Sequence, residues 1–318
     1  MRSLDFPRPT HGTAFLALAA IVLLSTCSTD TPVGLSTRPG PLGPPGGDGV
    51  TAALTASDQV FVGAGDIARC DRTDDEGTAA ILDTIAGTVF TLGDNVLGSS
   101  TQVPDFIDCY DPSWGRHKAR THPANDHLEY WSPGATTYFD YWGSAAGTRG
   151  QGYYSYDLGA WHIVVLNSGI STVAGSPQEL WLKADLAAST KRCTLAYWHF
   201  PRFSSTGTAV RDAVKPFWDD LYAAGAELVL NGHYDVYERF APQTPAGVLD
   251  PSFGIREFIV GTGGMGTSAV TAVQPNSEVR NPTVYGVIKF VLSADGYTWQ
   301  FIPAAPSTFT DSGSGACH

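Results

Sequence analysis

The chain has 318 residues, of which 43% are hydrophobic and 11% aromatic, so it can bury a substantial core in one large domain or two small ones. Charged residues make up only 16%, which excludes a disordered acidic polymer despite the formal net charge of -12. The negative charge argues against a nucleic-acid partner, because it would repel a phosphate backbone, but it does not exclude a small anionic substrate beside a bound metal.

Residues 1–27 have the pattern of an export signal. Arg2 and Arg8 precede an apolar run, residues 13–24, that is too short to span a membrane as a helix. The run ends in LSTC, which resembles a lipoprotein signal-peptidase site with Cys27 as the lipidated residue. We therefore expect an exported chain that is secreted, periplasmic or held at the cell surface by a lipid on Cys27.

The segment that follows, residues 28–57, is rich in Pro, Gly and Thr and predicts a flexible linker, with residues 58–318 as the folded domain. Disulfides persist outside the cytoplasm, so the cysteines of an exported domain are candidates for pairing. The domain has four of them: Cys70, Cys109, Cys193 and Cys317. Three pairings are possible, and we favour Cys70–Cys109 with Cys193–Cys317 over the other pairings and over buried free thiols.

Short apolar runs alternate with helical patterns along this domain. Strands are predicted at Val60–Ala64, Val89–Leu92, Trp161–Leu166, Thr194–Trp198, Glu227–Leu230, Glu257–Val260, Val284–Leu292 and Tyr297–Ile302. Helices are predicted at Thr78–Ile85, Pro177–Ala188 and Val210–Ala223. In the second helix, Leu180, Leu182 and Leu186 are spaced to cover one side. The alternation, followed by a mostly β tail, indicates a layered α/β domain.

Residues that can bind a metal follow four of the predicted strands. They are Asp66, Asp94, His199 and His233, with Asp235 two residues after the last. Each alone could simply cap a turn, but the loops beyond the carboxyl ends of strands carry the functional residues of α/β sheets, so the four together indicate a metal site. Carboxylates and imidazoles bind Zn, Mn or Fe, and two such ions about 4 Å apart could activate water and neutralise a phosphoryl oxygen.

At the level of motifs, the domain resembles the bacterial calcineurin-like metallophosphoesterases, and within them the secreted group similar to purple acid phosphatases. The motifs that carry this resemblance, in order, are GDIARC, TLGDN, YDPSWGR, PGATTYFDYWG, GYYSYDLGAWHIVVLNS, AYWHFPRFSS, LNGHYDVYERF and IREFIVGTGG. The resemblance implies a four-layer α/β/β/α sandwich and a dinuclear metal centre that hydrolyses phosphate esters. It also implies that Asp66 binds the first metal, that Asp94 bridges both metals, and that His199 and His233 bind the second.

The family motif GNHE corresponds here to PANDHLEY. Aligned without a gap, His127 replaces the metal-binding asparagine, and Leu128 replaces the histidine that contacts substrate and assists the leaving group. Aligned with a gap, Asn125 stays a ligand and His127 becomes the acid beside an inserted Asp126. We favour the ungapped alignment because the motif residues that follow stay in register.

Two further imidazoles of the family are replaced, the second histidine of HHPRF by Phe200 and that of GHDHNYER by Asp235. The ungapped alignment leaves the second metal with Asp94, His127, His199 and His233. The first metal is left with three carboxylates: Asp66, Asp94 and Asp235. An all-oxygen set favours harder ions such as Mn, Mg or Ca, so the two divalent or trivalent ions could be Mn, Zn, Fe, Mg or Ca. The alternative is a degraded first site in which Asp235 only makes a turn.

Loss of a general acid typically slows a reaction about 10²–10⁴-fold, so esters with good leaving groups would suffer least from the leucine at position 128. Asp126 and Glu129 flank this position and could supply a proton, which makes Asp126 and His127 the catalytic candidates. Arg202 and Arg239 could orient the loops around the metals or meet the substrate.

Three functions fit the sequence. The first is an exported metal-dependent phosphoesterase that acts on a small phosphate ester at an altered dinuclear centre. The second is a weak or inactive relative that serves as a binding protein at the cell surface. The third is a hydrolase that acts on something other than phosphate. Metal content and turnover of an activated phosphate ester discriminate among them.

Overall fold

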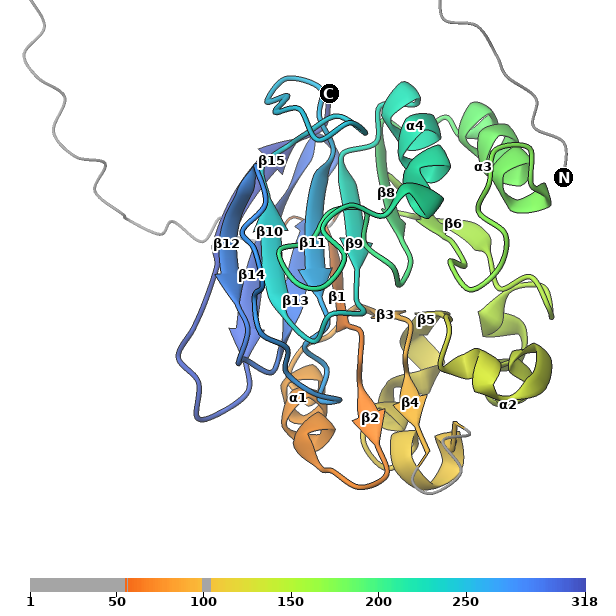
Figure 1. Cartoon of the computed structure of the whole chain (residues 1–318), viewed down its shortest axis with the longest axis vertical. Helices are drawn as coiled ribbons and strands as arrows, with labels where there is room; N and C mark the ends of the chain where they lie inside the picture. Colours follow the sequence, from red (N-terminus) through yellow and green to blue (C-terminus); the bar gives the residue numbers. More distant parts are fainter. Residues whose placement is uncertain (1–54, 56, 99–103) are drawn as a thin grey trace, which may run out of the picture. The chain divides into compact units, whose positions relative to one another are not determined.

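Two mixed β-sheets pack face to face at the centre of the fold (Figure 1). The computed structural model describes residue 55 and residues 57–98 and 104–318, within the unit Ala53–His318. The predicted export signal, Cys27 and nearly all of the predicted linker lie outside the described residues. Among the helices that are described, none is long and apolar enough to cross a membrane.

The first sheet has the strand order β15-β14-β13-β1-β3-β5, and β1, β3 and β5 are parallel. Its strands are β1 (Gln59–Ala64), β3 (Thr88–Leu92), β5 (Thr121–Ala124), β13 (Gly286–Leu292), β14 (Gly296–Pro303) and β15 (Ser312–Ala316). A small parallel ribbon of β2 (Ala68–Arg69) and β4 (Val96–Leu97) extends beyond the ends of β1 and β3 (Figure 1).

The second sheet has the order β12-β10-β11-β9-β8-β7-β6, and β7, β8, β9 and β11 are parallel. Its strands are β6 (Tyr154–Leu158), β7 (Trp161–Val165), β8 (Cys193–Tyr197), β9 (Leu228–Asn231), β10 (Tyr237–Phe240), β11 (Arg256–Val260) and β12 (Ser277–Asn281).

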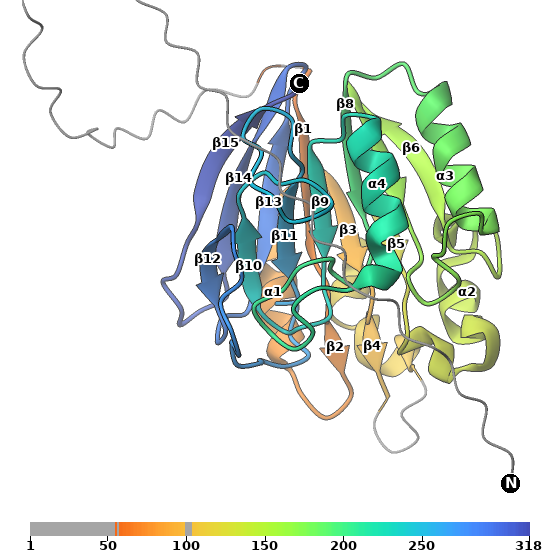
Figure 2. The ribbon, with the colours of Figure 1, turned by 45° about the horizontal axis from the view of Figure 1, so that its top comes forward.

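Four α-helices flank the sheets: α1 (Asp74–Asp83), α2 (Thr136–Trp142), α3 (Pro177–Ala188) and α4 (Lys215–Ala223). Short turns of other helix types are η1 (Phe106–Tyr110), η2 (Trp114–Arg120), η3 (Glu129–Trp131), η4 (Pro133–Ala135), η5 (Gly143–Ala146) and η6 (Asp212–Val214). Helices α3 and α4 lie over the outer face of the second sheet (Figure 2), and α1 and α2 pack against the first sheet.

Successive side chains of β7 point to opposite faces of the second sheet, so this sheet contributes to two hydrophobic cores. Ile163 and Val165 point into the core between the sheets, whereas Val164 points to the core under α3 and α4. In the inner core, Tyr197 of the second sheet lies with its ring centroid 6.0 Å from that of Phe61 in the first. The predicted fold class, a four-layer α/β/β/α sandwich, is confirmed.

The predicted disulfides are also confirmed. Cys70 is bonded to Cys109, and Cys193 is bonded to Cys317. The second bond joins the start of β8 to the segment after β15, 124 residues later.

Several element boundaries differ from the sequence prediction. Helix α1 begins at Asp74 instead of Thr78, with three acidic residues in the first turn that favour a helix N-terminus. Helix α4 begins at Lys215 instead of Val210, because the chain before it forms the separate turn η6. The prediction that Leu180 lies on the buried side of its helix is wrong. Leu180 is 55% exposed, whereas Leu182 is buried as predicted, together with Gln178 and Glu179.

Candidate metal centre

Five strands from the two sheets end at the same place and deliver the residues that the sequence singled out. β1 leads to Asp66, β3 to Asp94, β5 to His127, β8 to His199, and β9 to His233 and Asp235. These strand ends are close together because β1, β3 and β5 are parallel neighbours in one sheet, and β8 and β9 are parallel neighbours in the sheet packed against it.

Four of these residues form a compact group. Asp94, His127, His199 and His233 each offer one ligand atom, and these atoms all lie within 4.8 Å of one another. His199 Nε2 lies 3.0 Å from Asp94 Oδ2 and 3.2 Å from His233 Nδ1. His127 Nδ1 lies 3.3 Å from Asp94 Oδ1. This group, which we call the Asp94 cluster, has the three nitrogens and one oxygen of a tetrahedral metal site.

The tautomer of His199 is fixed by its other ring nitrogen. Nδ1 donates a hydrogen bond of 2.8 Å to the carbonyl of Leu92, so Nε2 is the ring nitrogen that faces the cluster. Histidines that bind metals are commonly oriented in this way by a backbone carbonyl. The His199 side chain is fully buried, which holds the ring in this single orientation.

Asp66 and Asp235 lie beside the Asp94 cluster but outside the four-residue group. Asp66 Oδ2 accepts a 2.7 Å hydrogen bond from the backbone of His233. Burial raises the pKa of the Asp66 carboxyl well above its usual range, and the nearby carboxylates of Asp235 and Asp94 raise it further, against the opposing effect of His199. A bound cation would stabilise these neighbouring carboxylates, because it offsets the repulsion between their charges.

The backbone is unusual at the same positions. Asp66, Asp94, His233 and Asp235 have φ angles of 54°, 48°, 80° and 46°, and they are four of the six described non-glycine residues with positive φ. Residues other than glycine rarely adopt a positive φ, and backbone strain of this kind is common at functional sites. The chain therefore turns sharply after each of these strands and aims the side chain back toward the sheet edge.

The loop after β5 is held by two buried carboxylates. Glu129 accepts hydrogen bonds from the backbone and side-chain amides of Asn95 and from the backbone of Asp126. Asp126 in turn accepts from the backbone of His127 and from the hydroxyl of Ser168. Both carboxyl groups are fully buried. Their role as proton donors stays a prediction, and in the structure they accept hydrogen bonds from the loops that carry Asp94 and His127.

His127 belongs to the Asp94 cluster, and Asn125 lies elsewhere in the same loop. The side-chain amide of Asn125 is buried against Gly152, where an added Cβ would lie 2.8 Å from Asn125 Oδ1. The His127 side chain is 38% exposed, whereas the side chains of Asp94 and His199 are 5% and 0% exposed. The ungapped alignment, which makes His127 the ligand, stays a prediction.

The residues present fit a metal ion. His127 Nδ1 is buried and makes no hydrogen bond. A nitrogen that could bind a metal therefore has no partner in the protein, although it lies 3.3 Å from Asp94 Oδ1. Burial lowers the pKa of His233 to about 2, with the positive charges of His199, His127 and Arg211 adding to the effect, so its imidazole is neutral and can act as a ligand. The Asp94 cluster therefore fits a metal site.

Two residues beside the cluster were not assigned to it from the sequence. The Phe200 ring lies 4.3 Å from that of His233, 5.3 Å from that of His199 and 5.4 Å from that of His127, centroid to centroid. The guanidinium carbon of Arg211 lies 4.1 Å from the Phe200 centroid. Arg211 comes 11 positions after Phe200 on an irregular loop, and no spacing rule would have found it.

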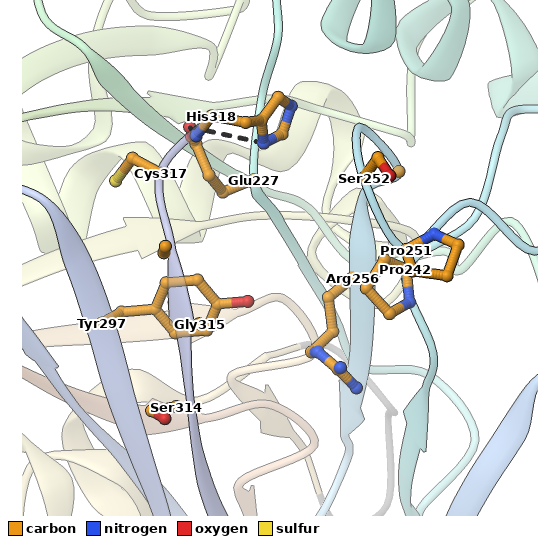
Figure 3. Close-up of a pocket in the computed structure, with 12 residues that line it drawn as sticks. Glu227, Pro242, Pro251, Ser252, Arg256, Tyr297, Ser314, Gly315, Cys317 and His318 are labelled. Atoms are coloured by element: carbon orange, nitrogen blue, oxygen red, sulfur yellow. Dashed lines mark hydrogen bonds and ion pairs between the residues drawn. The ribbon is translucent and has the colours of Figure 1, made fainter. Parts of the chain in front are cut away.

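A separate pocket of about 300 Å³ lies at the other end of β9 (Figure 3). Glu227, which precedes β9, lines this pocket, whereas His233 follows the strand. Glu227 also groups with Cys193 and Cys317, but these two sulfurs are joined in a disulfide and offer no thiolate. The pocket is thus distinct from the Asp94 cluster and lacks a comparable donor set.

The fold and the cluster define an α/β sandwich with a candidate metal site at the ends of its central strands. Comparison with known proteins agrees with this class. No family model matches the chain. Purple acid phosphatase 15 from Arabidopsis thaliana is 32% identical over 156 residues, which cover 47% of this chain and 28% of that protein. The chain thus spans less than a third of the length of this curated relative.

Two solved structures share the fold at low sequence identity. A purple acid phosphatase, PPD1, from yellow lupin (Lupinus luteus) aligns with a TM-score of 0.66 and 15% identity, over 82% of this chain and 54% of that one. GAP50 of Plasmodium, described as the anchor in the inner membrane complex, aligns with a TM-score of 0.59 and 12% identity, over 80% and 88% of the two chains. The chain is therefore related to the calcineurin-like metallophosphoesterases, with purple acid phosphatases among its relatives.

Proposed function

We propose that this protein is an exported, metal-dependent phosphoesterase that hydrolyses small phosphate esters at an altered metal centre. The observation that carries the proposal is the Asp94 cluster, three imidazoles and a carboxylate at converging strand ends, in a fold shared with purple acid phosphatases. When bound, a metal ion supplies Lewis-acid neutralisation of phosphoryl charge and acidifies water. A second ion beside Asp66 and Asp235 is part of the proposal.

The chain's own residues set the limits of this chemistry. His199 offers a nitrogen donor fixed by burial and by a backbone contact, and His233 offers a second at 3.2 Å from it. Leu128 is buried at the position where the resemblance implies a proton donor. Because this side chain cannot protonate a leaving group, the favoured substrates are esters whose leaving groups depart without assistance, such as aryl phosphates.

Export is proposed on two grounds. The first is the N-terminal pattern of residues 1–27, with Cys27 as a candidate lipid anchor. The second is the pair of disulfides in the folded domain, which persist in oxidising compartments.

The test compares the wild-type chain with Asp94→Asn and with Asp140→Asn, an exposed carboxylate on α2 that serves as the control. Each is supplied with Mn, Zn, Fe or Mg, and hydrolysis of 4-nitrophenyl phosphate is measured. We expect metal-dependent turnover that Asp94→Asn reduces by more than the roughly 10–100-fold that loss of a mere supporting partner causes. Asp140→Asn should match the wild type.

A second function is favoured by the apolar and acidic replacements at Leu128, Phe200 and Asp235. In this alternative the chain binds metal but has no useful turnover, and serves as a binding protein at the cell surface. Metal binding without hydrolysis of any activated ester would reject the phosphoesterase in its favour. Equal turnover by Asp94→Asn and the wild type would reject the site itself.

A further inference from the structure

Arg211 is a positive charge beside the Asp94 cluster that has no carboxylate of its own. Among the described residues, no acidic oxygen lies within 4.0 Å of its guanidinium. Its Nε is buried without an acceptor, and Nη2 makes only a long hydrogen bond of 3.4 Å to the hydroxyl of Tyr234. The remaining N–H groups of its guanidinium can therefore donate hydrogen bonds to a ligand.

Unlike Arg211, the two arginines that the sequence suggested as loop-orienting or substrate-contacting residues are paired with carboxylates. Arg202 is buried and paired with Asp212 at 2.8 Å. Arg239 is paired with Asp311 at 2.7 Å and also with Glu278. Their charges are neutralised within the protein, so Arg211 is the better candidate to meet an anion.

The backbone fixes where Arg211 lies. After β8 the chain loops out and returns, with Phe203 bridged to Val210 and the backbone of Arg211 donating a 2.8 Å hydrogen bond to the carbonyl of Arg202. This return sets the guanidinium over the Phe200 ring, a cation–π contact at 4.1 Å. Since Phe200 also contacts His127, His199 and His233, Arg211 is one aromatic ring away from the cluster.

The contact between Arg211 and Phe200 offers a physical reason for the phenylalanine at position 200, where the motifs of the family have a histidine. Phe200 stands where the resemblance implies an imidazole, so a polar group that could contact a phosphate is missing at that position. Arginine presents planar donors that match two phosphate oxygens at once, and it stays charged at any physiological pH. Stacking on Phe200 holds the guanidinium beside this position, 4.1 Å from the ring centroid.

We propose that Arg211, held by Phe200, forms a phosphate-binding subsite beside the Asp94 cluster and binds the unesterified oxygens of a phosphate monoester. This inference rests on the proposed function. A monoester dianion, which has three such oxygens, can engage both the cluster and Arg211, and it gains more from an added cation than a singly charged diester does. Arg211 is thus a substrate-binding residue that favours phosphate monoesters.

The test uses the full chain loaded with Mn or Zn, in the wild type, Arg211→Ala, Arg211→Lys and the control Arg149→Ala, an exposed arginine paired with Asp140. Three quantities are measured: metal per chain, the Kd of inorganic phosphate by calorimetry, and kcat and KM for 4-nitrophenyl phosphate and bis(4-nitrophenyl) phosphate. Arg211→Ala should keep its metal but bind phosphate about 10–100-fold more weakly, the loss expected for hydrogen bonds to a charged group. The KM for the monoester should rise by a similar factor, and Arg211→Lys should recover part of the loss.

The outcomes separate this inference from the proposed function. Hydrolysis and phosphate binding that are unchanged in Arg211→Ala would overturn the subsite and leave the phosphoesterase intact. Phosphate binding that depends on Arg211 in a chain without turnover would support the subsite and overturn the phosphoesterase. Equal losses for the monoester and the diester would overturn the preference for monoesters, and a metal-loaded wild type that binds no phosphate would overturn the subsite.

Discussion

Glu129 connects two ligand-bearing loops through one buried carboxylate. It holds Asn95, the residue after Asp94, at 2.7 and 2.8 Å, and it holds the backbone of Asp126, the residue before His127, at 2.8 Å. Burial raises its pKa to about 7, and the nearby charge of Asp94 adds to the effect. Its hydrogen bonds are all with backbone and amide donors, so we infer that it positions the two candidate ligands, Asp94 and His127.

At this scale we predict that Glu129→Gln weakens metal binding about 10-fold or more, as losses of groups that support metal ligands commonly do. The reason is that a glutamine amide replaces one of the two acceptor oxygens and leaves at least one of the buried N–H groups unpaired. Metal affinity is measured by competition with a chelator, with Glu76→Gln as the control because Glu76 is half exposed on α1. Unchanged affinity in Glu129→Gln would show that the loops do not depend on this carboxylate.

The sequence predicted the strand-end residues because each stands directly after an apolar run, a local pattern. The roles of Glu129 and Arg211 depend on contacts with residues 34 and 11 positions away, at Asn95 and Phe200. Neither separation follows from the periodicity of a helix or strand. Contacts of this kind are set by the packing of loops, which the sequence alone does not reveal.

The turn after strand β9 lies close to side chains that follow both sheets. Gly232 follows β9, and a Cβ at this position would lie 2.7 Å from Asp66 Oδ2 and 3.2 Å from His199 Nδ1. The missing side chain lets a ligand from the first sheet and a ligand from the second approach the same point. The LNGH start of the motif LNGHYDVYERF thus lets residues from the two sheets approach each other as well as delivering His233.

We predict that Gly232→Ala displaces Asp66 or His199 and lowers metal affinity about 10-fold or more without unfolding the protein, since a shift of either ligand acts like loss of its supporting contacts. The matched control is Gly77→Ala, which lies exposed in α1 with its nearest contact at 3.4 Å. That change should stabilise the protein by up to about 1 kcal/mol through helix propensity and leave metal binding unaltered. Metal competition and chemical denaturation measure both effects, and equal metal affinity in the two variants would contradict the role given to Gly232.

Element prediction succeeded where hydrophobic patterns are regular. Helix α3 has the predicted bounds, Pro177–Ala188, and β1, β3, β8 and β11 differ from prediction by about one residue at an end. Strand β5, which was not predicted, has the sequence THPA and lies at the edge of its sheet, where a proline does not interrupt the hydrogen-bonded ladder. Its short and partly polar sequence gives no strand signal, although it leads directly to His127.

In the whole molecule, the Asp94 cluster and the Cys193–Cys317 disulfide lie at opposite ends of β9. The Cys193–Cys317 bond lies near Glu227, before the strand, and the Asp94 cluster lies after it. The fold class followed from the order of strands and helices and from the resemblance of the motifs. The way in which two sheets bring five strand ends together could be expected only from the family, because it depends on long-range packing.

The most direct measurement is the metal content of the purified chain after loading with Mn or Zn and extensive dialysis. We expect at least one ion per chain in the wild type and in the control His162→Gln, a buried histidine paired with Asp185 outside the cluster. We expect loss of that ion in His199→Gln, because Nε2 of His199 is central to the Asp94 cluster. A wild-type chain that retains no metal, or His199→Gln with undiminished metal, would contradict the assignment of the Asp94 cluster as a metal site.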